Sequence, residues 1–481
     1  MIYFCIKNHD YINSVQTGIQ IFYPNTNYIK VDEISNTGIT IESIAHEDFC
    51  EAIMYIDGSK KASDSYEVDK TSDKGVKMAV KSAIYMLLSK ETGYYPKWGS
   101  ITGVRPAKTA GELMESGLSE EETVKYFMDK FFVSEEKARL AVTVSKAEEK
   151  ILSLNKDGDV SIYIGIPFCP TRCLYCSFTS YPLDRYSKVV DSYLDKLIEE
   201  IKFICSLVKG RRIMSVYIGG GTPTSLNEVQ LERLLKAVNE NIDLKEVLEF
   251  TVEAGRPDTI TLEKLKVMKK YGVERISINP QTMNQKTLDL IGRRHSVEDI
   301  KNVYKMAREV GFKDINMDVI LALPEETAED VRYTMEEIKK LAPDSMTVHT
   351  LAVKRASRLK EEFENYELTQ TKEIEKMISI SAEYAEKMGL RPYYMYRQKN
   401  MAGNFENVGY CKEGCEGIYN IEIMEEKQTI IAAGAGGTTK VYKKDKNLLV
   451  RAFNVKGIEE YMGRFEEMLE RKVEALKSEN I

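Results

Sequence analysis

Residues 161–178 read SIYIGIPFCPTRCLYCSF, an apolar β-branched run followed at once by three cysteines within eight residues. The first half of this stretch is typical of a buried strand, because parallel strands covered on both faces are almost continuously apolar. Cys169, Cys173 and Cys176 then occupy the loop after the strand. In α/β folds the loops at this end of parallel strands hold the active site. The stretch therefore predicts a functional thiol cluster on a parallel sheet.

The same alternation of strand and helix continues along the chain. Six apolar segments are each separated by a long helical pattern: SIYIGIPF, SVYIGGG, LEFTVEAG, ERISINPQ, INMDVILALP and SMTVHTL. Six such repeats indicate a parallel sheet covered by helices. Both a doubly wound sheet and a partly closed TIM-like barrel fit this number of strands.

The regions on either side follow other patterns. Short runs such as TGIQIFYP and AIMYID predict strands up to about residue 70, and amphipathic helices are expected from there to about residue 152. The chain ends with the glycine-rich segment IIAAGAGGTTK and a charged helix. We therefore expect an N-terminal α+β domain over 1–155, a central domain over 156–358 and a C-terminal α+β extension over 359–481.

The segment KWGSITGVRPAK holds Trp98, the only tryptophan of the chain. It lies between two predicted helices. Two interpretations stay open at this point: a connecting turn with Trp98 packed beneath it, or an arm that reaches over the active site of the next domain.

Composition excludes several classes of protein. The chain has 481 residues, a formal net charge of -7 and a pI near 5.6, which argues against a nucleic-acid partner. No apolar run approaches the roughly 20 residues that span a bilayer, and the N-terminal residues MIYFCIKNHDYIN do not resemble a signal peptide. We expect a cytoplasmic monomer without a membrane span, whose eight cysteines are free thiols or metal ligands.

Three interpretations of the cysteine cluster compete. A structural zinc site needs a fourth ligand at short spacing, and none is found there. The four histidines are His9, His46, His295 and His349. Chance clustering of buried thiols is the second interpretation. An iron–sulfur cluster normally takes four thiolates, so three thiolates leave one iron of a four-iron cluster open for a substrate or cofactor. Only this third interpretation explains both the number and the place of the cysteines.

The spacing C-x3-C-x2-C, with Tyr175 before the last cysteine, resembles the signature of the radical S-adenosylmethionine (radical SAM) superfamily. The segments YIGIPFC, CLYCSF, YIGGGTPT, TVEAG, INPQ and DVILALP resemble the oxygen-independent coproporphyrinogen III oxidase family. The N-terminal extension with TGVRP and the later segments RQKNMAGNFENVGYC and IIAAGAGGTTK look most like its HemZ-type branch. The resemblance implies an α/β fold with a partial TIM-like (βα)6 barrel.

The resemblance also implies the cofactors and their ligands. It implies a [4Fe-4S] cluster held by Cys169, Cys173 and Cys176, and one or two molecules of S-adenosylmethionine, one of them at the open iron. The residues implied to contact S-adenosylmethionine are Tyr163, Tyr175, Gly220, Gly221, Thr222, Glu253, Gln281, Arg293, Asp318 and Ile320. Without the resemblance, Glu253 could also be a salt-bridged residue at a strand end, and Arg293 a solvated residue at a helix end. A phosphate loop at GGGTP is disfavoured because the G-x4-G-K-[ST] pattern is absent.

The implied substrate is an anionic tetrapyrrole with four propionates. The implied reaction is the oxidative decarboxylation of coproporphyrinogen III to protoporphyrinogen IX, with a reduced flavodoxin- or ferredoxin-type protein as electron donor. Arginine is geometrically suited to carboxylates. The candidate cations for the propionates are Arg256, Arg294, Arg355 and Arg397.

One position departs from the oxidase pattern. The oxidase branch has a further cysteine two residues after the last cluster ligand, where this chain has Phe178. The related heme-chaperone branch also lacks that cysteine. A heme-binding chaperone therefore remains an alternative. A radical SAM methyltransferase is a second alternative, which a methylated product and S-adenosylhomocysteine would identify.

The other five cysteines give weaker signals. Cys411 and Cys415 form a C-x3-C pair that is either an ordinary turn, a redox pair or part of a second site. The remaining three lie in apolar contexts and are expected in the core: Cys5, Cys50 and Cys205.

Overall fold

The computed structural model describes all residues except 25, 353–356, 362–369, 398–404 and 478–481. The chain forms two compact units, one of residues 1–146 with 395–406 and one of residues 147–394 with 407–481. Within the described residues, no helix is both long enough and apolar enough to cross a membrane.

The first unit is built on a five-stranded sheet in the order β2-β1-β3-β4-β5. Its strands are β1 (Ile2–Lys7), β2 (Tyr28–Lys30), β3 (Ile39–Ala45), β4 (Phe49–Ile56) and β5 (Ser59–Glu67). Helices α1 (Ile12–Phe22) and α2 (Gly75–Thr92) pack on it and share its apolar core. Cys5 and Cys50 are buried in this sheet, as predicted.

The predicted strand TGIQIFYP is wrong, because most of it belongs to helix α1. Val15, Gly18 and Ile19 of this helix are buried at the i, i+3, i+4 spacing of one helix face. The absence of a side chain at Gly18 allows close packing, since an added Cβ would lie 3.2 Å from Cγ2 of Ile84 on α2. Packing against α2 thus overrides the strand preference of the β-branched residues.

The helices predicted after residue 73 are confirmed. Beyond α2 they are α3 (Pro106–Glu115), α4 (Glu120–Phe131) and α5 (Glu135–Leu152). A capping box between Ser119 and Glu122 starts α4. In the segment before α3, Trp98 is buried and its Nε1 donates a hydrogen bond of 2.7 Å to Oε2 of Glu406. Trp98 is therefore packed within its own unit, as a connecting turn requires.

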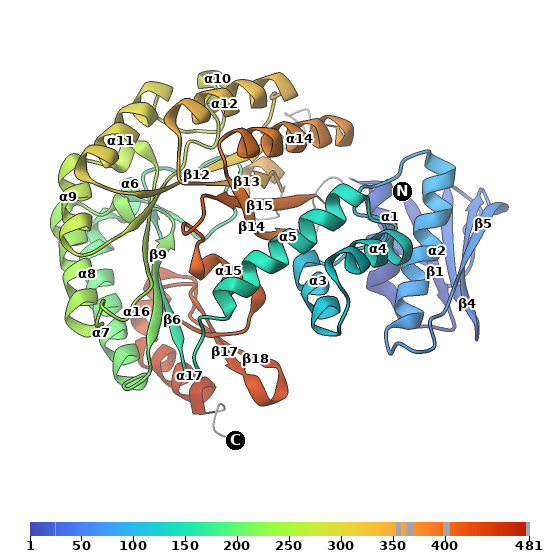
Figure 1. The fold of residues 1–481 in the computed structure, drawn as a ribbon, viewed down its shortest axis with the longest axis horizontal. Coiled ribbons are helices and arrows are strands. Elements are labelled where there is room, and N and C mark those ends of the chain that lie inside the picture. The colour runs from blue at the N-terminus through green and yellow to red at the C-terminus, as the bar shows by residue number, and fades with distance from the viewer. Residues whose placement is uncertain (25, 353–356, 362–369, 398–404, 478–481) are drawn as a thin grey trace. The chain divides into compact units, whose positions relative to one another are not determined.

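The second unit contains the predicted parallel sheet, so the expected partial TIM-like barrel is confirmed. Its six strands lie side by side in chain order: β6 (Val160–Ile166), β9 (Ile213–Gly220), β10 (Glu249–Gly255), β11 (Arg275–Ile278), β12 (Asp314–Leu321) and β13 (Ser345–Thr350). Figure 1 shows the strands of this sheet on the inner side of an outer row of helices. Those helices are α7 (Val190–Leu207), α8 (Glu228–Asn241), α9 (Leu262–Lys270), α11 (Val297–Val310) and α12 (Ala328–Leu341).

Strands from the last part of the chain extend this sheet on both edges. On one edge β15 (Glu406–Cys411) pairs antiparallel with β13, and β14 (Arg391–Arg397) follows. On the other edge β16 (Thr429–Ala433) pairs parallel with β6, followed by β17 (Thr438–Lys443) and β18 (Leu448–Phe453). Helix α15 (Ile418–Glu425) connects the two edges. The remaining helices of this part are α13 (Arg358–Glu361), α14 (Thr371–Lys387), α16 (Ile458–Gly463) and α17 (Phe465–Lys477).

Candidate active site

The three clustered cysteines follow the carboxyl end of β6. Cys169 ends the two-residue strand β7 (Phe168–Cys169), which pairs with β8 (Tyr181–Pro182). Cys169 and Cys173 are buried, and Cys176 is half-buried. Leu174 anchors the loop, since its N–H donates to the carbonyl of Ile291 (3.0 Å) and its side chain is buried in a small apolar cluster. The backbone and side chain of Leu174 thus hold the middle of the loop in place, between Cys173 and Cys176.

The three thiols do not converge on a single point. Within the described ranges, no group of three or more His, Cys, Asp and Glu side chains could hold one metal ion. A mononuclear zinc site requires such convergence. A four-iron cluster does not, because each thiolate binds a different iron.

The GGGTP segment braces the cysteine loop. The N–H groups of Gly221 and Thr222 donate to the carbonyls of Ile166 and Phe168, both at 2.8 Å. A Cβ added at Gly221 would lie 2.6 Å from the Phe168 carbonyl oxygen and 3.0 Å from Sγ of Cys169. The hydroxyl of Thr222 is 3.4 Å from the same sulfur. The glycines are therefore required for the close approach of the cysteine loop itself.

Two acidic side chains face the barrel interior at this end. Glu253 on β10 accepts hydrogen bonds from the hydroxyl of Tyr217 (2.5 Å) and the N–H of Gly220 (3.3 Å). Burial raises the pKa of Glu253 to about 7, and the Asp318 carboxylate adds to this. Burial would also raise the pKa of Asp318, but His349 and other hydrogen-bond donors lower it overall. The two carboxyl groups therefore titrate in different pH ranges.

A second group of predicted residues lies around Tyr175, the residue before Cys176. Nη2 of Arg293 donates to the hydroxyl of Tyr175 (3.1 Å), and Nη1 donates to the carbonyl of Asn279 (3.2 Å). Gln281 has a left-handed backbone (φ 68°) and exchanges backbone hydrogen bonds of 2.9 Å with Asp318 and Ile320. β12 is thereby tied to the loop after β11.

Three buried polar atoms of this group lack a hydrogen-bond partner within the described residues. They are Oδ1 of Asn279, Oε1 of Gln281 and Nε of Arg293. Buried polar atoms in native proteins nearly always have partners, so such a group of unsatisfied atoms indicates a place for a ligand.

The structure thus brings the predicted residues to one end of the barrel, on β6, β9, β10 and β12 or in the segments that follow β6, β9 and β11. The sequence did not single out Asn279, His349, Tyr217 or Tyr419. Tyr217 and His349 lie on strands β9 and β13, and Asn279 directly follows β11, two positions before the predicted Gln281, so strand alternation is a signal that could have found these three. Tyr419, on α15, had no such signal.

The four arginines predicted as partners for the propionates differ in their burial and in their neighbours. Arg256 is buried and pairs with Asp258, with Nη2 2.6 Å from Oδ2. Arg294 is exposed. Arg397 is buried in the first unit, over the ring of Trp98. Arg355 lies outside the described residues.

Cys411 and Cys415 lie at the other end of the barrel. Nη1 of Arg275, the first residue of β11, donates to the carbonyl of Cys415 (2.9 Å). Burial raises the pKa of both thiols, that of Cys415 to about 11. The cluster cysteines follow the carboxyl end of β6, so this pair is separated from them by the length of the barrel strands.

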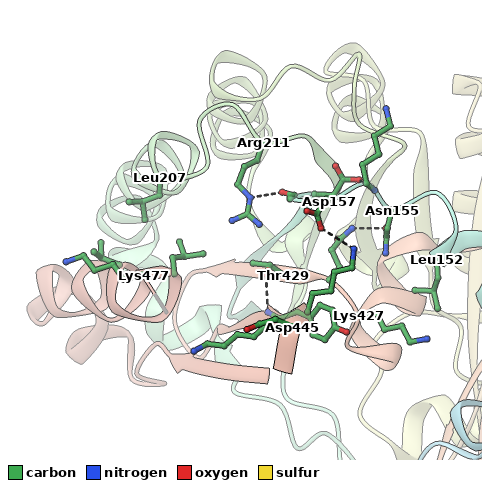
Figure 2. A pocket seen from close by; sticks show the side chains of 18 residues that line it. Leu152, Asn155, Asp157, Leu207, Arg211, Lys427, Thr429, Asp445 and Lys477 are labelled. Carbon is green, nitrogen blue, oxygen red and sulfur yellow. Dashed lines mark hydrogen bonds and ion pairs between the residues drawn. The ribbon is translucent and has the colours of Figure 1, made fainter. Parts of the chain in front are cut away.

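A large pocket of about 1160 Å³ also lies away from the cysteine loop. Figure 2 shows the side chains around it, among them Asn155, Asp157 and Thr429. The wall includes Asp159, directly before β6, so the pocket opens at the amino end of that strand. No residue of the predicted site lines it.

Comparisons with known proteins agree with this geometry. Residues 163–338 match the Radical SAM superfamily. The oxygen-independent coproporphyrinogen-III oxidase-like protein HemZ of Bacillus subtilis is 40% identical over 415 residues, which cover 85% of this chain and 83% of that protein. The heme chaperone HemW of Bacillus subtilis is 37% identical over 40% of this chain and 50% of its own length. The oxygen-independent coproporphyrinogen III oxidase of Escherichia coli is 34% identical over 40% of this chain and 42% of its own length.

Among solved structures, coproporphyrinogen III oxidase (HemN) from Escherichia coli resembles the fold with a TM-score of 0.52 and 22% identity, over 66% of this chain and 72% of that one. The long match to HemZ covers both the cysteine loop and the strands that carry the rest of the site. The chain therefore belongs to the HemN/HemZ family of the radical SAM superfamily.

Proposed function

We propose that this chain is a radical SAM oxidoreductase that converts coproporphyrinogen III to protoporphyrinogen IX without oxygen. In this proposal Cys169, Cys173 and Cys176 hold a [4Fe-4S] cluster, and S-adenosylmethionine binds beside it. The observation that carries the proposal is the set of unsatisfied buried polar atoms next to a loop of three thiols.

The residues present fit both groups. Three thiols in one braced loop suit three irons and leave the fourth open. Two unsatisfied acceptors and one unsatisfied donor suit a ligand with amino, hydroxyl and carboxylate groups. When bound, the two groups together supply a carbon-centred radical that abstracts hydrogen from the substrate.

In this proposal, residues of the chain bind and orient S-adenosylmethionine. Glu253, ionised, would accept hydrogen bonds from the ribose hydroxyls. Nε of Arg293 would donate to the cofactor, while its other nitrogens stay on Tyr175 and Asn279. Ile320 packs with the apolar residues around Leu174 and helps to exclude water from the site.

The substrate in this proposal is an anionic tetrapyrrole bound with the help of residues 359–481, and exposed Arg294 is a candidate partner for a propionate. The electron donor would be a reduced flavodoxin- or ferredoxin-type protein, acting on a monomer that binds one or two molecules of S-adenosylmethionine. HemZ, the relative with the longest reported match, carries an oxidase-like name.

A heme-binding chaperone is the second candidate. Phe178 stands where the oxidase branch has a further cysteine, and its side chain is 68% exposed next to the cluster loop. The identity to the heme chaperone is also similar to the identity to the oxidase over comparable lengths.

The experiment is an anaerobic assay of iron-reconstituted protein with S-adenosylmethionine, a reductant and coproporphyrinogen III, followed by chromatography of both products. Formation of 5′-deoxyadenosine together with protoporphyrinogen IX is expected. The variant Cys173→Ala should form neither. If the wild type forms 5′-deoxyadenosine but leaves the porphyrinogen unchanged, the oxidase reaction is excluded and stable heme binding becomes the test of the second candidate.

A further inference from the structure

Three tyrosines stack beside Glu253 inside the barrel. Tyr163 and Tyr217 are register neighbours on β6 and β9, with ring centroids 6.2 Å apart. The ring of Tyr419 lies 4.3 Å from that of Tyr217, with 21° between their planes. All three rings belong to one buried or half-buried apolar cluster.

Tyr419 lies beside Tyr217 because of the route that the chain takes between β15 and β16. Helix α15 runs from β15, beside one edge strand of the barrel, to β16, beside the other (Figure 1). Its first N–H, from Ile418, donates to the carboxylate of Glu249 on β10. The helix also packs against β9. It is therefore anchored on the concave side of the sheet, with Tyr419 directed at Tyr217.

Tyr217 in turn fixes Glu253. The phenol hydroxyl donates to Oε1 at 2.5 Å, while the N–H of Gly220 donates to Oε2 at 3.3 Å. Gly219 lies between them, and a Cβ added there would be 2.8 Å from the Tyr217 ring and 2.9 Å from Oε2 of Glu253. Both carboxylate oxygens thus accept a hydrogen bond, and the absence of a side chain at Gly219 leaves the space that the Tyr217 ring and Glu253 occupy.

The hydroxyl of Tyr217 is not needed to fill space, because phenylalanine has nearly the same shape. A hydroxyl that donates to a buried carboxylate favours its ionised form. Burial and the Asp318 carboxylate act in the opposite direction on Glu253. The titratable groups that face Glu253 are Tyr217, Asp318, His349, Tyr163 and Tyr419. Among them only the Tyr217 hydroxyl donates a hydrogen bond to Glu253 in the described structure.

We propose that Tyr217 is a positioning residue for S-adenosylmethionine: its hydroxyl orients Glu253 and favours the ionised carboxylate, and the Tyr419 ring on α15 holds Tyr217 in place. This inference deepens the proposed function and rests on it, because it takes Glu253 as the group that binds the ribose hydroxyls. It makes the segment between β15 and β16 part of the cofactor site, although that segment carries no predicted cofactor residue.

The test measures the affinity of iron-reconstituted, oxidised protein for S-adenosylmethionine by equilibrium dialysis between pH 6 and 9, without reductant. In Tyr217→Phe the carboxylate loses a charge-assisted hydrogen bond, so affinity at pH 7 should fall about tenfold. The midpoint of the pH profile should move to higher pH, because Glu253 then binds its proton more tightly. Tyr419→Leu should weaken binding in the same pH range, since Tyr217 loses its support.

Two controls separate this role from general packing. Tyr304→Phe removes another buried hydroxyl, one that interacts with Arg308, and should leave the profile unchanged. In the Glu253→Gln background, Tyr217→Phe should no longer change the pH profile, because the amide at position 253 does not titrate. The inference would be overturned if Tyr217→Phe bound S-adenosylmethionine with the wild-type affinity, or if its affinity fell by the same factor at every pH. A wild-type protein that retains its iron and binds no S-adenosylmethionine would instead overturn the proposed function.

Discussion

Nη1 of Arg256 lies 3.8 Å from Sγ of Cys173, while Nε and Nη2 of the same guanidinium donate to the two carboxylate oxygens of Asp258. The arginine also donates to the hydroxyl of Thr171 at the start of the cysteine loop (2.8 Å). A buried cation is therefore held against one of the predicted cluster ligands. Positive charge at this distance favours the reduced cluster, which carries one more negative charge.

Replacement of Arg256 by Gln should make the reduction potential of the reconstituted cluster more negative, by on the order of tens of millivolts. A redox titration followed by electron paramagnetic resonance measures this shift. Arg308→Gln is the matched control, because Arg308 also pairs with an aspartate, Asp344 (2.6 Å), but at the amino end of β13. Equal potentials in wild type and Arg256→Gln would contradict the prediction.

Gly221→Ala should disrupt the cysteine loop, since the new methyl group would lie 2.6 Å from the Phe168 carbonyl and 3.0 Å from Sγ of Cys169. We expect a loss of most reconstituted iron, with a decrease in stability of roughly 1–3 kcal/mol, as for other overpacked sites. Iron content and the thermal midpoint measure the two effects. Gly463→Ala on α16, where an added Cβ meets nothing within 4 Å, should change neither. Full iron content in Gly221→Ala would show that the loop can adjust.

Glu422 on α15 is fully buried, and burial raises its pKa to about 7, with the neighbouring Glu425 adding to the effect. An unfolded glutamate has a lower pKa, so this group destabilises the fold progressively as pH rises from about 4.5 to 7, and fully above that. Glu422→Gln should therefore be more stable than wild type at pH 8 by on the order of 2–3 kcal/mol. At pH 4.5 the difference should vanish.

Thermal unfolding at several pH values between 4.5 and 8 measures this difference. Glu474→Gln, at an exposed position on α17, is the control and should follow the wild-type curve throughout. A constant difference between Glu422→Gln and wild type over the whole range would refute the titration of Glu422.

Lys472 on α17 and Glu200 on α7 form a fully buried ion pair, with Nζ 2.6 Å from Oε1. Glu200 also accepts from the N–H of Gly434 (2.7 Å) and the hydroxyl of Tyr461 (2.6 Å). Lys472→Met would leave a buried carboxylate without its cation, so we expect a loss of about 3–5 kcal/mol. Lys477→Met, at an exposed position of the same helix, should be nearly neutral. Chemical denaturation of both variants checks this, and similar midpoints would contradict it.

Prediction from sequence succeeded where the signal is local. All six barrel strands and the helices α2 to α5 were found from apolar periodicity, because burial of one face imposes a period of 2 or 3.6 residues on the chain. It failed at α1, where Ile19 and Ile21 suggested a strand. Only packing against Ile84, far along the chain, explains why that segment is a helix.

The candidate site likewise has one part that could be predicted from the sequence and one part that could not. The spacing of Cys169, Cys173 and Cys176 and the glycines of GGGTP lie within short segments, so their chemistry can be predicted from the residues and their neighbours. The stack of Tyr419 on Tyr217 joins residues from distant parts of the chain. No local pattern indicates that contact, because it depends on the route of α15 between two sheet edges.

The sequence by itself thus determined the alternating α/β fold and the thiol loop after the first barrel strand, because hydrophobic period and ligand spacing are properties of neighbouring residues. Only the tertiary structure decided how buried charges are compensated. Glu200 and Lys472 are 272 positions apart, and each would be costly to bury alone. Their pairing follows from the packing of α17 against α7, two helices that lie far apart along the chain, so no local pattern in the sequence indicates it.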